Sequence, residues 1–140
     1  WLGDEDWDVI HFNFGLHDLK FMDDGERQVP LEEYEDNLEQ IVQRLLETGA
    51  TLIWASTTPV PEGGVKPHRI PDDVPAYNAA ARRIMDRHDI AVNPLYTRAL
   101  PVLDEIQKPV DVHFTEKGSC VLAEWVVEAI DAALEECEGT

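Results

Sequence analysis

The sequence predicts an α/β fold built on a parallel sheet. Hydrophobic patterning along the 140 residues gives the order strand, helix, strand, helix, strand, helix. Strands that alternate with helices pair in parallel and are joined by right-handed crossovers. With 44% hydrophobic residues, the chain carries enough apolar material for one modest core. We therefore predict a single α/β domain over residues 1–140.

The first half of the chain contains two predicted strands and one helix. Trp7 to Phe14 is an apolar run interrupted by His11 and Asn13, which is typical of a buried parallel strand. An apolar stripe then predicts a helix that ends at Gly49, a residue suited to the left-handed position after a helix. Thr51 to Ser56 is the second predicted strand. The helical stripe comprises Leu31, Tyr34, Leu38, Ile41, Val42, Leu45 and Leu46.

The middle of the chain begins with a loop and continues into the second helix. Prolines and glycines between Thr57 and Pro71 predict the loop. Asp72 or Asp73 is expected to cap the helix that follows, and Ile90 to Asn93 is the third predicted strand. The inner face of this helix is expected to carry Tyr77, Ala81, Ile84 and His88.

The C-terminal part is predicted to be helical. A weakly helical region from Leu95 to Ile106 precedes the clearest amphipathic helix, which Thr115 is expected to cap. The apolar stripe of this last helix comprises Val121, Leu122, Trp125, Val126, Ala129, Ile130, Ala133 and Leu134.

Three strands make a thin sheet, and the first of them is as apolar as a central strand. Trp1-Leu2-Gly3 has the character of the end of an earlier helix, with Gly3 as its C-cap. We therefore expect that sequence preceding residue 1, including one or two further strands, belongs to the same domain.

The charge balance narrows the classes of partner. The chain has 29 acidic and 11 basic residues, a formal net charge of −18, and such a surface repels phosphate backbones. We therefore predict no nucleic-acid partner. The absence of a long apolar run predicts no membrane span. The acidic excess fits either solubility at high salt or an ordinary well-solvated surface.

Polar segments follow the strands and converge at one edge of the predicted sheet. In parallel α/β sheets, ligands bind beyond the carboxyl ends of the strands. The segments Gly15–Asp18, Ser56–Gly64 and Asn93–Tyr96 all follow strand ends, and a loop around His113 leads into the last helix. We expect these segments to lie on one rim.

His113 is the first candidate for a catalytic residue. A histidine near a cleft can accept a proton from a hydroxyl nucleophile and return it to a leaving group. Asp111 lies two residues earlier and could orient the imidazole ring. On position alone, a histidine at a helix entry more often packs or caps, and Asp111 would then be an ordinary loop carboxylate.

The Gly15-Leu16-His17-Asp18 segment is the second candidate. Gly15 lets the backbone approach a ligand closely, and its amide is suited to donate to a developing oxyanion. His17 is a candidate second donor. The alternative is a plain strand-to-loop turn in which Asp18 caps backbone amides.

The sequence offers neither a convincing nucleophile nor a convincing set of metal ligands. Ser56 lacks the flanking glycines of a nucleophile elbow, and Ser119 lies inside the last helix. A metal cluster of His11, His17, Asp18 and His113 is disfavoured, because neither an HExxH nor a CxxC spacing is present. We predict no metal and no cofactor.

Taken together, these segments resemble the SGNH hydrolases, also called GDSL-type esterases and lipases. Gly15-Leu16-His17-Asp18 is similar to the Gly-x-Asn-Asp block of that family, and Asp111-Val112-His113-Phe114-Thr115 followed by Gly118 to its Asp and His block. Trp54-Ala55-Ser56-Thr57-Thr58-Pro59 and Tyr77-Asn78 are also similar to what the family carries between those blocks. The resemblance extends from Trp7 through the last helix.

The resemblance implies a flavodoxin-like, three-layer α/β/α domain that hydrolyses esters through an acyl-serine intermediate. It implies His113 as general base, Asp111 as its orienting carboxylate, and Gly15 and His17 as oxyanion-hole residues. Three features depart from the family pattern. The Gly-Asp-Ser block with the nucleophile is absent, position 17 is His rather than Asn, and the family's Asp position falls on Val110.

Two functions therefore remain in view. The first is an ester hydrolase, acting on small-molecule or carbohydrate esters, of which this chain carries the base and the oxyanion residues. The second is a non-catalytic α/β domain that binds a ligand or partner. A receiver-like signalling domain is disfavoured, because the first strand ends in Asn13-Phe14-Gly15 without a phosphoacceptor aspartate. The sequence leaves localisation and oligomeric state open.

Overall fold

The sheet is parallel, as predicted. The computed structural model describes residues 2–3 and 5–138, with side chains up to residue 135. Within these residues the strands β1 (Val9–Phe12), β2 (Thr51–Ala55) and β3 (Ala91–Asn93) form one sheet in the order β1-β2-β3. Both pairings are parallel, with Ile10 opposite Leu52 and Trp54 opposite Val92.

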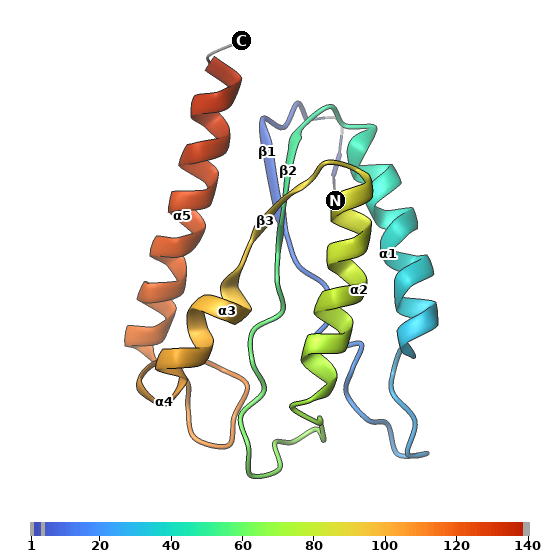
Figure 1. The fold of residues 1–140 in the computed structure, drawn as a ribbon, viewed down its shortest axis with the longest axis vertical. Coiled ribbons are helices and arrows are strands. Elements are labelled where there is room, and N and C mark those ends of the chain that lie inside the picture. The colour runs from blue at the N-terminus through green and yellow to red at the C-terminus, as the bar shows by residue number, and fades with distance from the viewer. Residues whose placement is uncertain (1, 4, 139–140) are drawn as a thin grey trace.

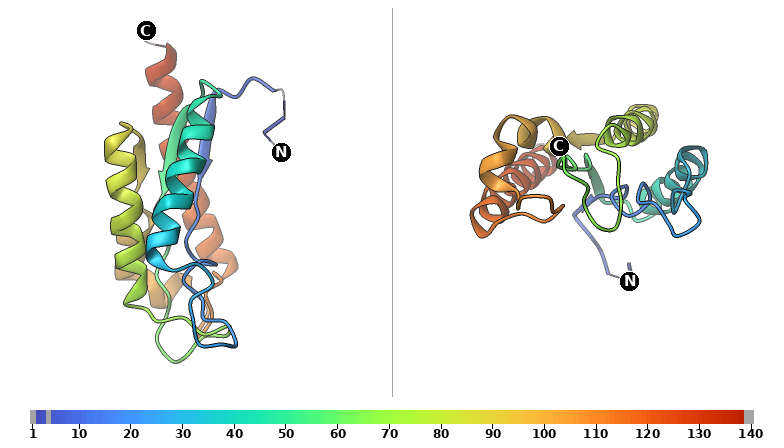
Figure 2. Two further views of the ribbon diagram at one scale, coloured as in Figure 1. Left: turned by 90° about the vertical axis from the view of Figure 1, so that its right-hand side faces the viewer. Right: turned by 90° about the horizontal axis from the view of Figure 1, so that it is seen from below.

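Helices cover both faces of this sheet and make three layers (Figures 1 and 2). One layer holds α1 (Leu31–Leu46) and α2 (Asp73–Arg87), which pack against each other. The other holds α5 (Glu116–Glu138), which contacts all three strands. The weakly helical region is α3 (Leu95–Ala99), the 3-10 turn η1 (Leu100–Val102) and α4 (Leu103–Ile106). The predicted flavodoxin-like arrangement is confirmed.

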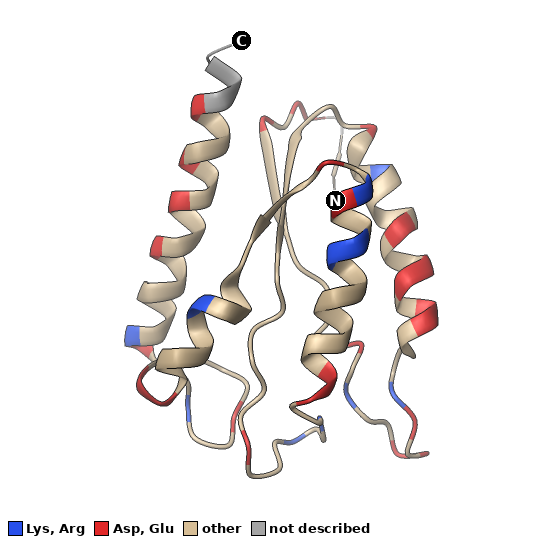
Figure 3. Cartoon of the chain, viewed as in Figure 1, with Lys and Arg blue, Asp and Glu red and all other residues tan. Residues whose placement is uncertain are grey.

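The densest core lies between the sheet and the α1–α2 layer. Leu38, Val42 and Val74 are at most 1% exposed there, and Trp54 of β2 is equally buried. The α5 layer is looser. Of the described residues in its predicted stripe only Ala133 is buried, and Leu134 is 38% exposed. Acidic residues are spaced along α1 and α5 (Figure 3).

Several local predictions hold and others fail for identifiable reasons. Gly49 adopts a φ of +76° after α1, and the Thr115 hydroxyl accepts the Gly118 amide at 3.0 Å as an N-cap. Leu46 is wrong as a core residue, since it lies in the last turn of α1 and is 41% exposed. The expected aspartate cap of α2 is also wrong. Asp72 makes no side-chain cap bond, and Asp73 instead accepts a bidentate pair from Arg27 at 2.8 and 2.9 Å.

The N-terminal segment does not continue a helix within the described residues. Trp1 lies outside them, and Leu2 and Gly3 are not helical, with Gly3 at a φ of +63°. Further strands before residue 1 stay a prediction. None of the helices in the described part of the chain is long and apolar enough to cross a membrane.

Candidate active site

The polar segments predicted to converge do lie at one end of the sheet. The loops that follow β1 and β2, and the loop before α5, all project beyond the carboxyl ends of the strands (Figure 1). The Thr57–Pro71 loop contacts the other two loops. Arg69 donates to the Leu16 carbonyl on one side, and Gln107 donates to the Pro59 carbonyl on the other. The Thr57–Pro71 loop therefore connects the loop after β1 with the loop before α5.

Asp111 and His113 form a hydrogen-bonded pair. One Asp111 oxygen, Oδ1, lies 2.6 Å from His113 Nδ1 and also accepts the backbone amide of His113 at 2.9 Å. The backbone amide and, next, the imidazole ring lower the pKa of Asp111 from its ordinary value. An ionised carboxylate can only accept hydrogen bonds, so the proton of a neutral His113 ring resides on Nδ1. Nε2 is then left as a free acceptor.

The backbone of this loop explains why a spacing of two residues suffices. Val110 has a φ of +54°, and the Lys108 amide donates to the His113 carbonyl at 3.0 Å. The chain thus turns tightly between them, and Asp111 folds back onto its neighbour two residues on, as in an Asx turn. The His113 side chain is 76% exposed, so Nε2 faces open solvent among the described residues.

Gly15 is fixed by contact with the neighbouring strand end. Its φ is +150°, and a Cβ built on it would lie 2.3 Å from Thr57 Oγ1. Glycine is therefore required here because the segment after β1 packs closely on Thr57, which follows β2, and the expected approach of a ligand stays a prediction. Leu19 completes the turn by donating its amide to the Gly15 carbonyl at 3.1 Å.

Hydrogen bonds to Thr57 connect the end of β1 with the end of β2. The Asn78 side chain accepts the Thr57 amide at 2.8 Å and donates to the Thr57 carbonyl at 2.9 Å. Asn13 donates to the Ala55 carbonyl at 2.7 Å and to Thr57 Oγ1 at 3.1 Å. The Thr57 side chain thus holds the loop that begins at Gly15.

Arg69 supports the same loop, and no local sequence pattern predicts this role. It is 4% exposed, and its guanidinium donates to the Leu16 carbonyl at 2.8 Å and to the Pro67 carbonyl at 3.1 Å. No carboxylate pairs with it among the described residues. Burial lowers the pKa of Arg69, and the two carbonyls supply the compensation that a buried cation needs.

The carboxyl group of Asp18 affects whether the Gly15 amide is free to donate a hydrogen bond to a ligand. Burial raises the pKa of Asp18, and this effect is partly offset by the backbone amides of Asp18 and Gly15 and by His17. The Gly15 amide therefore already faces an acceptor in the resting structure. His17 is exposed on the same turn, so its ring is free to approach a ligand.

The remaining candidates are placed elsewhere. Ser56 is 8% exposed, and its Oγ accepts the Tyr96 amide at 2.8 Å, which ties the end of β2 to α3. Ser119 lies in the first turns of α5. Neither has a bond to His113 in the part of the chain that the structure describes. His11 Nε2 lies in the sheet, 3.2 Å from Asn93 Nδ2. No group of three potential metal ligands occurs among the described residues.

Comparison with known proteins gives a consistent family and fold. A family model described as the GDSL-like lipase/acylhydrolase family matches residues 1–119. The structure is similar to a lipase/acylhydrolase from Enterococcus faecalis, with a TM-score of 0.75, 21% identity, and 89% of this chain and 62% of that chain covered. No curated protein matches the sequence significantly.

Two further solved structures share the fold. An acetyl xylan esterase, AlAXEase, has a TM-score of 0.71 at 16% identity, with 88% of this chain and 67% of that chain covered. LAE5, an alpha/beta hydrolase enzyme from the metagenome of Lake Arreo, Spain, has a TM-score of 0.69 at 20% identity, with 87% and 59% covered. This chain therefore spans about three fifths of the length of the first of these structures.

Proposed function

The chain belongs to the GDSL-like lipase/acylhydrolase family, and from that premise we propose that it carries the general base and the oxyanion-binding loop of a serine ester hydrolase. The observation that carries the proposal is the bond between His113 Nδ1 and Asp111 Oδ1, 2.6 Å long, at the carboxyl end of a parallel sheet. Ionised Asp111 holds the ring in the tautomer whose Nε2 can accept a proton.

The reaction follows from this tautomer. His113 Nε2 takes the proton of a serine hydroxyl as the serine oxygen attacks the ester carbonyl. The resulting imidazolium gives that proton to the leaving alcohol, and an acyl-serine forms. In the second half, Nε2 takes a proton from water as the water oxygen attacks the acyl carbon. The bond between the acyl carbon and the serine oxygen then breaks, the imidazolium returns its proton to that oxygen, and the carboxylic acid leaves. Asp111 stabilises the imidazolium in both halves without taking a proton itself.

The Gly15–Asp18 turn is the proposed oxyanion-binding loop. The Gly15 amide and the His17 ring are the two donors that we assign to the developing negative charge. Donation from Gly15 requires that its amide move from Asp18 toward the oxyanion. Thr57 and Arg69 hold the neighbouring carbonyls of this turn, those of Phe14 and Leu16, in place.

The nucleophile is assigned to a serine outside this chain. Ser56 is buried with its hydroxyl engaged by Tyr96, and Ser119 is part of α5. The whole enzyme would supply the serine in a Gly-Asp-Ser segment next to β1. We therefore expect the 140-residue chain alone to show no ester turnover.

The proposed substrates are small-molecule esters, including acylated carbohydrates. A structural neighbour with the same fold is an acetyl xylan esterase, which makes O-acetyl sugars reasonable first substrates to test. The strongly acidic surface is compatible with neutral substrates and unfavourable for polyanions.

A non-catalytic binding domain is the second candidate function. The observation that favours it is the His113 ring, which is 76% exposed and has no hydroxyl partner among the described residues. A degenerate relative would keep such a loop without using it in catalysis.

Hydrolysis of a short-chain aryl ester separates the two functions. The assay compares this chain with an N-terminally extended form that contains a Gly-Asp-Ser segment. Turnover by the extended form alone supports the esterase. An extended form with that segment but without turnover on any ester tested favours the binding domain, and covalent labelling of Ser56 in the short chain would contradict our assignment of the nucleophile.

A further inference from the structure

A cavity lies directly beside the loop that carries Asp111 and His113. It has a volume of about 650 Å³, within the range of small-molecule sites. One wall is Lys108, Pro109 and Val110, the three residues that precede Asp111. Because the Lys108 amide donates to the His113 carbonyl at 3.0 Å, this wall and the proposed base belong to one closed turn. The cavity therefore lies next to the turn that holds the proposed base.

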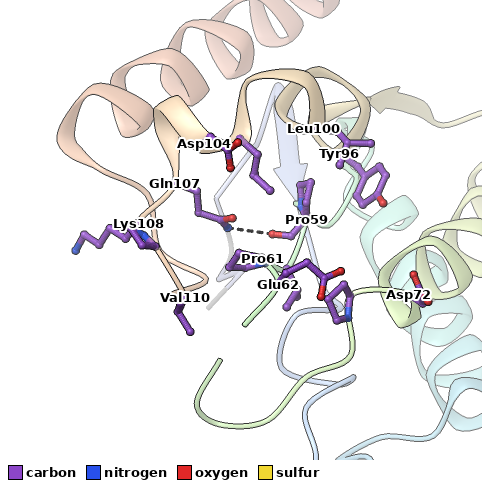
Figure 4. Close-up of a pocket in the computed structure, with 14 residues that line it drawn as sticks. Pro59, Pro61, Glu62, Asp72, Tyr96, Leu100, Asp104, Gln107, Lys108 and Val110 are labelled. Atoms are coloured by element: carbon purple, nitrogen blue, oxygen red, sulfur yellow. Dashed lines mark hydrogen bonds between the residues drawn. The ribbon is translucent and has the colours of Figure 1, made fainter. Parts of the chain in front are cut away.

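The lining of the cavity combines apolar surface with free acceptors. Pro59, Pro61 and Leu103 supply apolar surface, and Tyr96 adds an aromatic ring (Figure 4). The lining also includes three carboxylates, those of Glu62, Asp72 and Asp104. None of the three makes a hydrogen bond or ion pair with another described residue. They are therefore available as hydrogen-bond acceptors.

The buried side-chain amide of Gln107 is a second observation that points to a polar ligand. Gln107 lines the cavity and is 5% exposed. Its Nε2 donates to the carbonyls of Pro59 at 3.0 Å and Val112 at 3.3 Å, which fixes the amide with its nitrogen toward them. Its Oε1 has no hydrogen-bond partner among the described residues. Leaving a buried acceptor unpaired is costly, so a hydroxyl donor that reached this oxygen would be favoured.

The charges on the cavity select among ligands. Lys108 extends away from the other labelled lining residues (Figure 4), and the remaining charged residues of the lining are the carboxylates of Glu62, Asp72 and Asp104. Anionic groups are therefore repelled. A long acyl chain is disfavoured as well, because it would desolvate carboxylates without offering them hydrogen bonds. A ligand with many hydroxyl donors and apolar C–H faces matches both the acceptors and the proline and tyrosine surfaces.

We propose that the cavity formed by the Thr57–Pro71 loop, α3, α4 and residues 107–110 binds the neutral, polyhydroxylated leaving group of the substrate, a sugar ring. This proposal rests on the proposed esterase function for its place in a reaction, but sugar binding itself needs no nucleophile. The carboxylates and Gln107 accept hydroxyl hydrogens, and Tyr96 packs against a ring face.

The test is an NMR titration of the 140-residue chain with cellotriose, a neutral probe. We expect saturable shifts centred on Tyr96, Gln107 and Val110. Tyr96→Ala and the double variant Glu62→Gln with Asp72→Asn should each weaken binding about fivefold or more, the loss expected for charge-assisted hydrogen bonds or a buried ring contact. Glu124→Gln, which removes an exposed carboxylate on α5 outside the cavity, should leave the affinity unchanged.

Three further probes decide between ligand classes. Trigalacturonate is anionic, a glucosamine trimer is cationic, and the neutral ester methyl hexanoate represents an acyl chain. Cavity shifts with any of these in preference to cellotriose would overturn the assignment to a neutral sugar. The absence of cavity shifts with all four would overturn the cavity as a ligand site. Because turnover is not measured, a failed titration leaves the esterase proposal intact, and a failed ester assay leaves the sugar site intact.

Discussion

Gly15→Ala should destabilise the protein strongly, because two separate costs coincide at this position. The new Cβ would lie 2.3 Å from Thr57 Oγ1, more than an ångström inside ordinary contact. Overpacking of this kind costs about 1–3 kcal/mol, and a side chain at a φ of +150° adds about 1–3 kcal/mol of backbone strain. Thr57 cannot retreat easily, since Asn78 holds both its amide and its carbonyl. We expect a loss of about 3–5 kcal/mol, a large part of the total stability of a small domain.

A double-mutant cycle with Thr57, measured by urea unfolding, separates the two costs. Thr57→Ala removes Oγ1 and should recover about 1–3 kcal/mol of the Gly15→Ala loss as coupling energy. Thr57→Val is the matched control, because it loses the same hydroxyl but keeps the bulk, so it should recover nothing. A Gly15→Ala protein within about 0.5 kcal/mol of the parent would refute the close packing. Equal recovery by both Thr57 variants would show that bulk at Oγ1 is not the cause.

Three other predictions concern charges. The pKa of Glu39 is lowered from 4.5 to about 2 by hydrogen bonds from Arg87 and then His88, so the pair stabilises the fold above pH 4.5 and this contribution is lost as pH falls toward 2. Glu39→Gln should therefore lower the free energy of unfolding by only about 1 kcal/mol at pH 7, because Arg87 is 60% exposed and its charge is screened by solvent. In acid unfolding, the difference from the parent should vanish near pH 2. A difference that does not change with pH would contradict this. Arg69→Met should lower the unfolding free energy by about 2–4 kcal/mol, because it leaves two buried carbonyls without a donor and opens a gap. Arg69→Lys should recover only part of this loss. Equal stability of all three proteins in urea would exclude a supporting role. Added KCl should raise the melting temperature by screening repulsion within a chain of net charge −18, and a temperature that falls with salt would contradict that source of instability.

Local patterns were sufficient for the elements but not for the residues that hold the site together. The helix ends at Gly49 and Thr115 follow from local backbone chemistry and were predicted. Arg69 contacts Leu16 across 53 positions of sequence, and nothing in its immediate neighbours announces a buried cation. Contacts of this kind depend on which loops the sheet brings together at one end. The hydrophobic periodicity of the sequence does not contain that information.

The same limit applies to the spacing of the candidate base and its carboxylate. Counting residues placed Asp111 one position away from the family pattern, which weakened it as a partner for His113. The structure joins the two side chains because Val110 turns the backbone at a φ of +54°, a conformation that a β-branched residue seldom adopts. The α5 stripe shows the converse case, since its periodicity predicted a core face, whereas most of its described side chains are only half-buried.

The rate of covalent labelling by a fluorophosphonate probe tests the proposed base most directly. It is measured on an N-terminally extended form that contains a Gly-Asp-Ser segment, and on its His113→Ala variant. Removing a general base should slow labelling by about 10²–10⁴-fold, whereas His68→Ala, which alters an exposed histidine in the neighbouring loop, should leave the rate unchanged. Labelling that proceeds equally fast in the His113→Ala variant would contradict the assignment of His113 as the base.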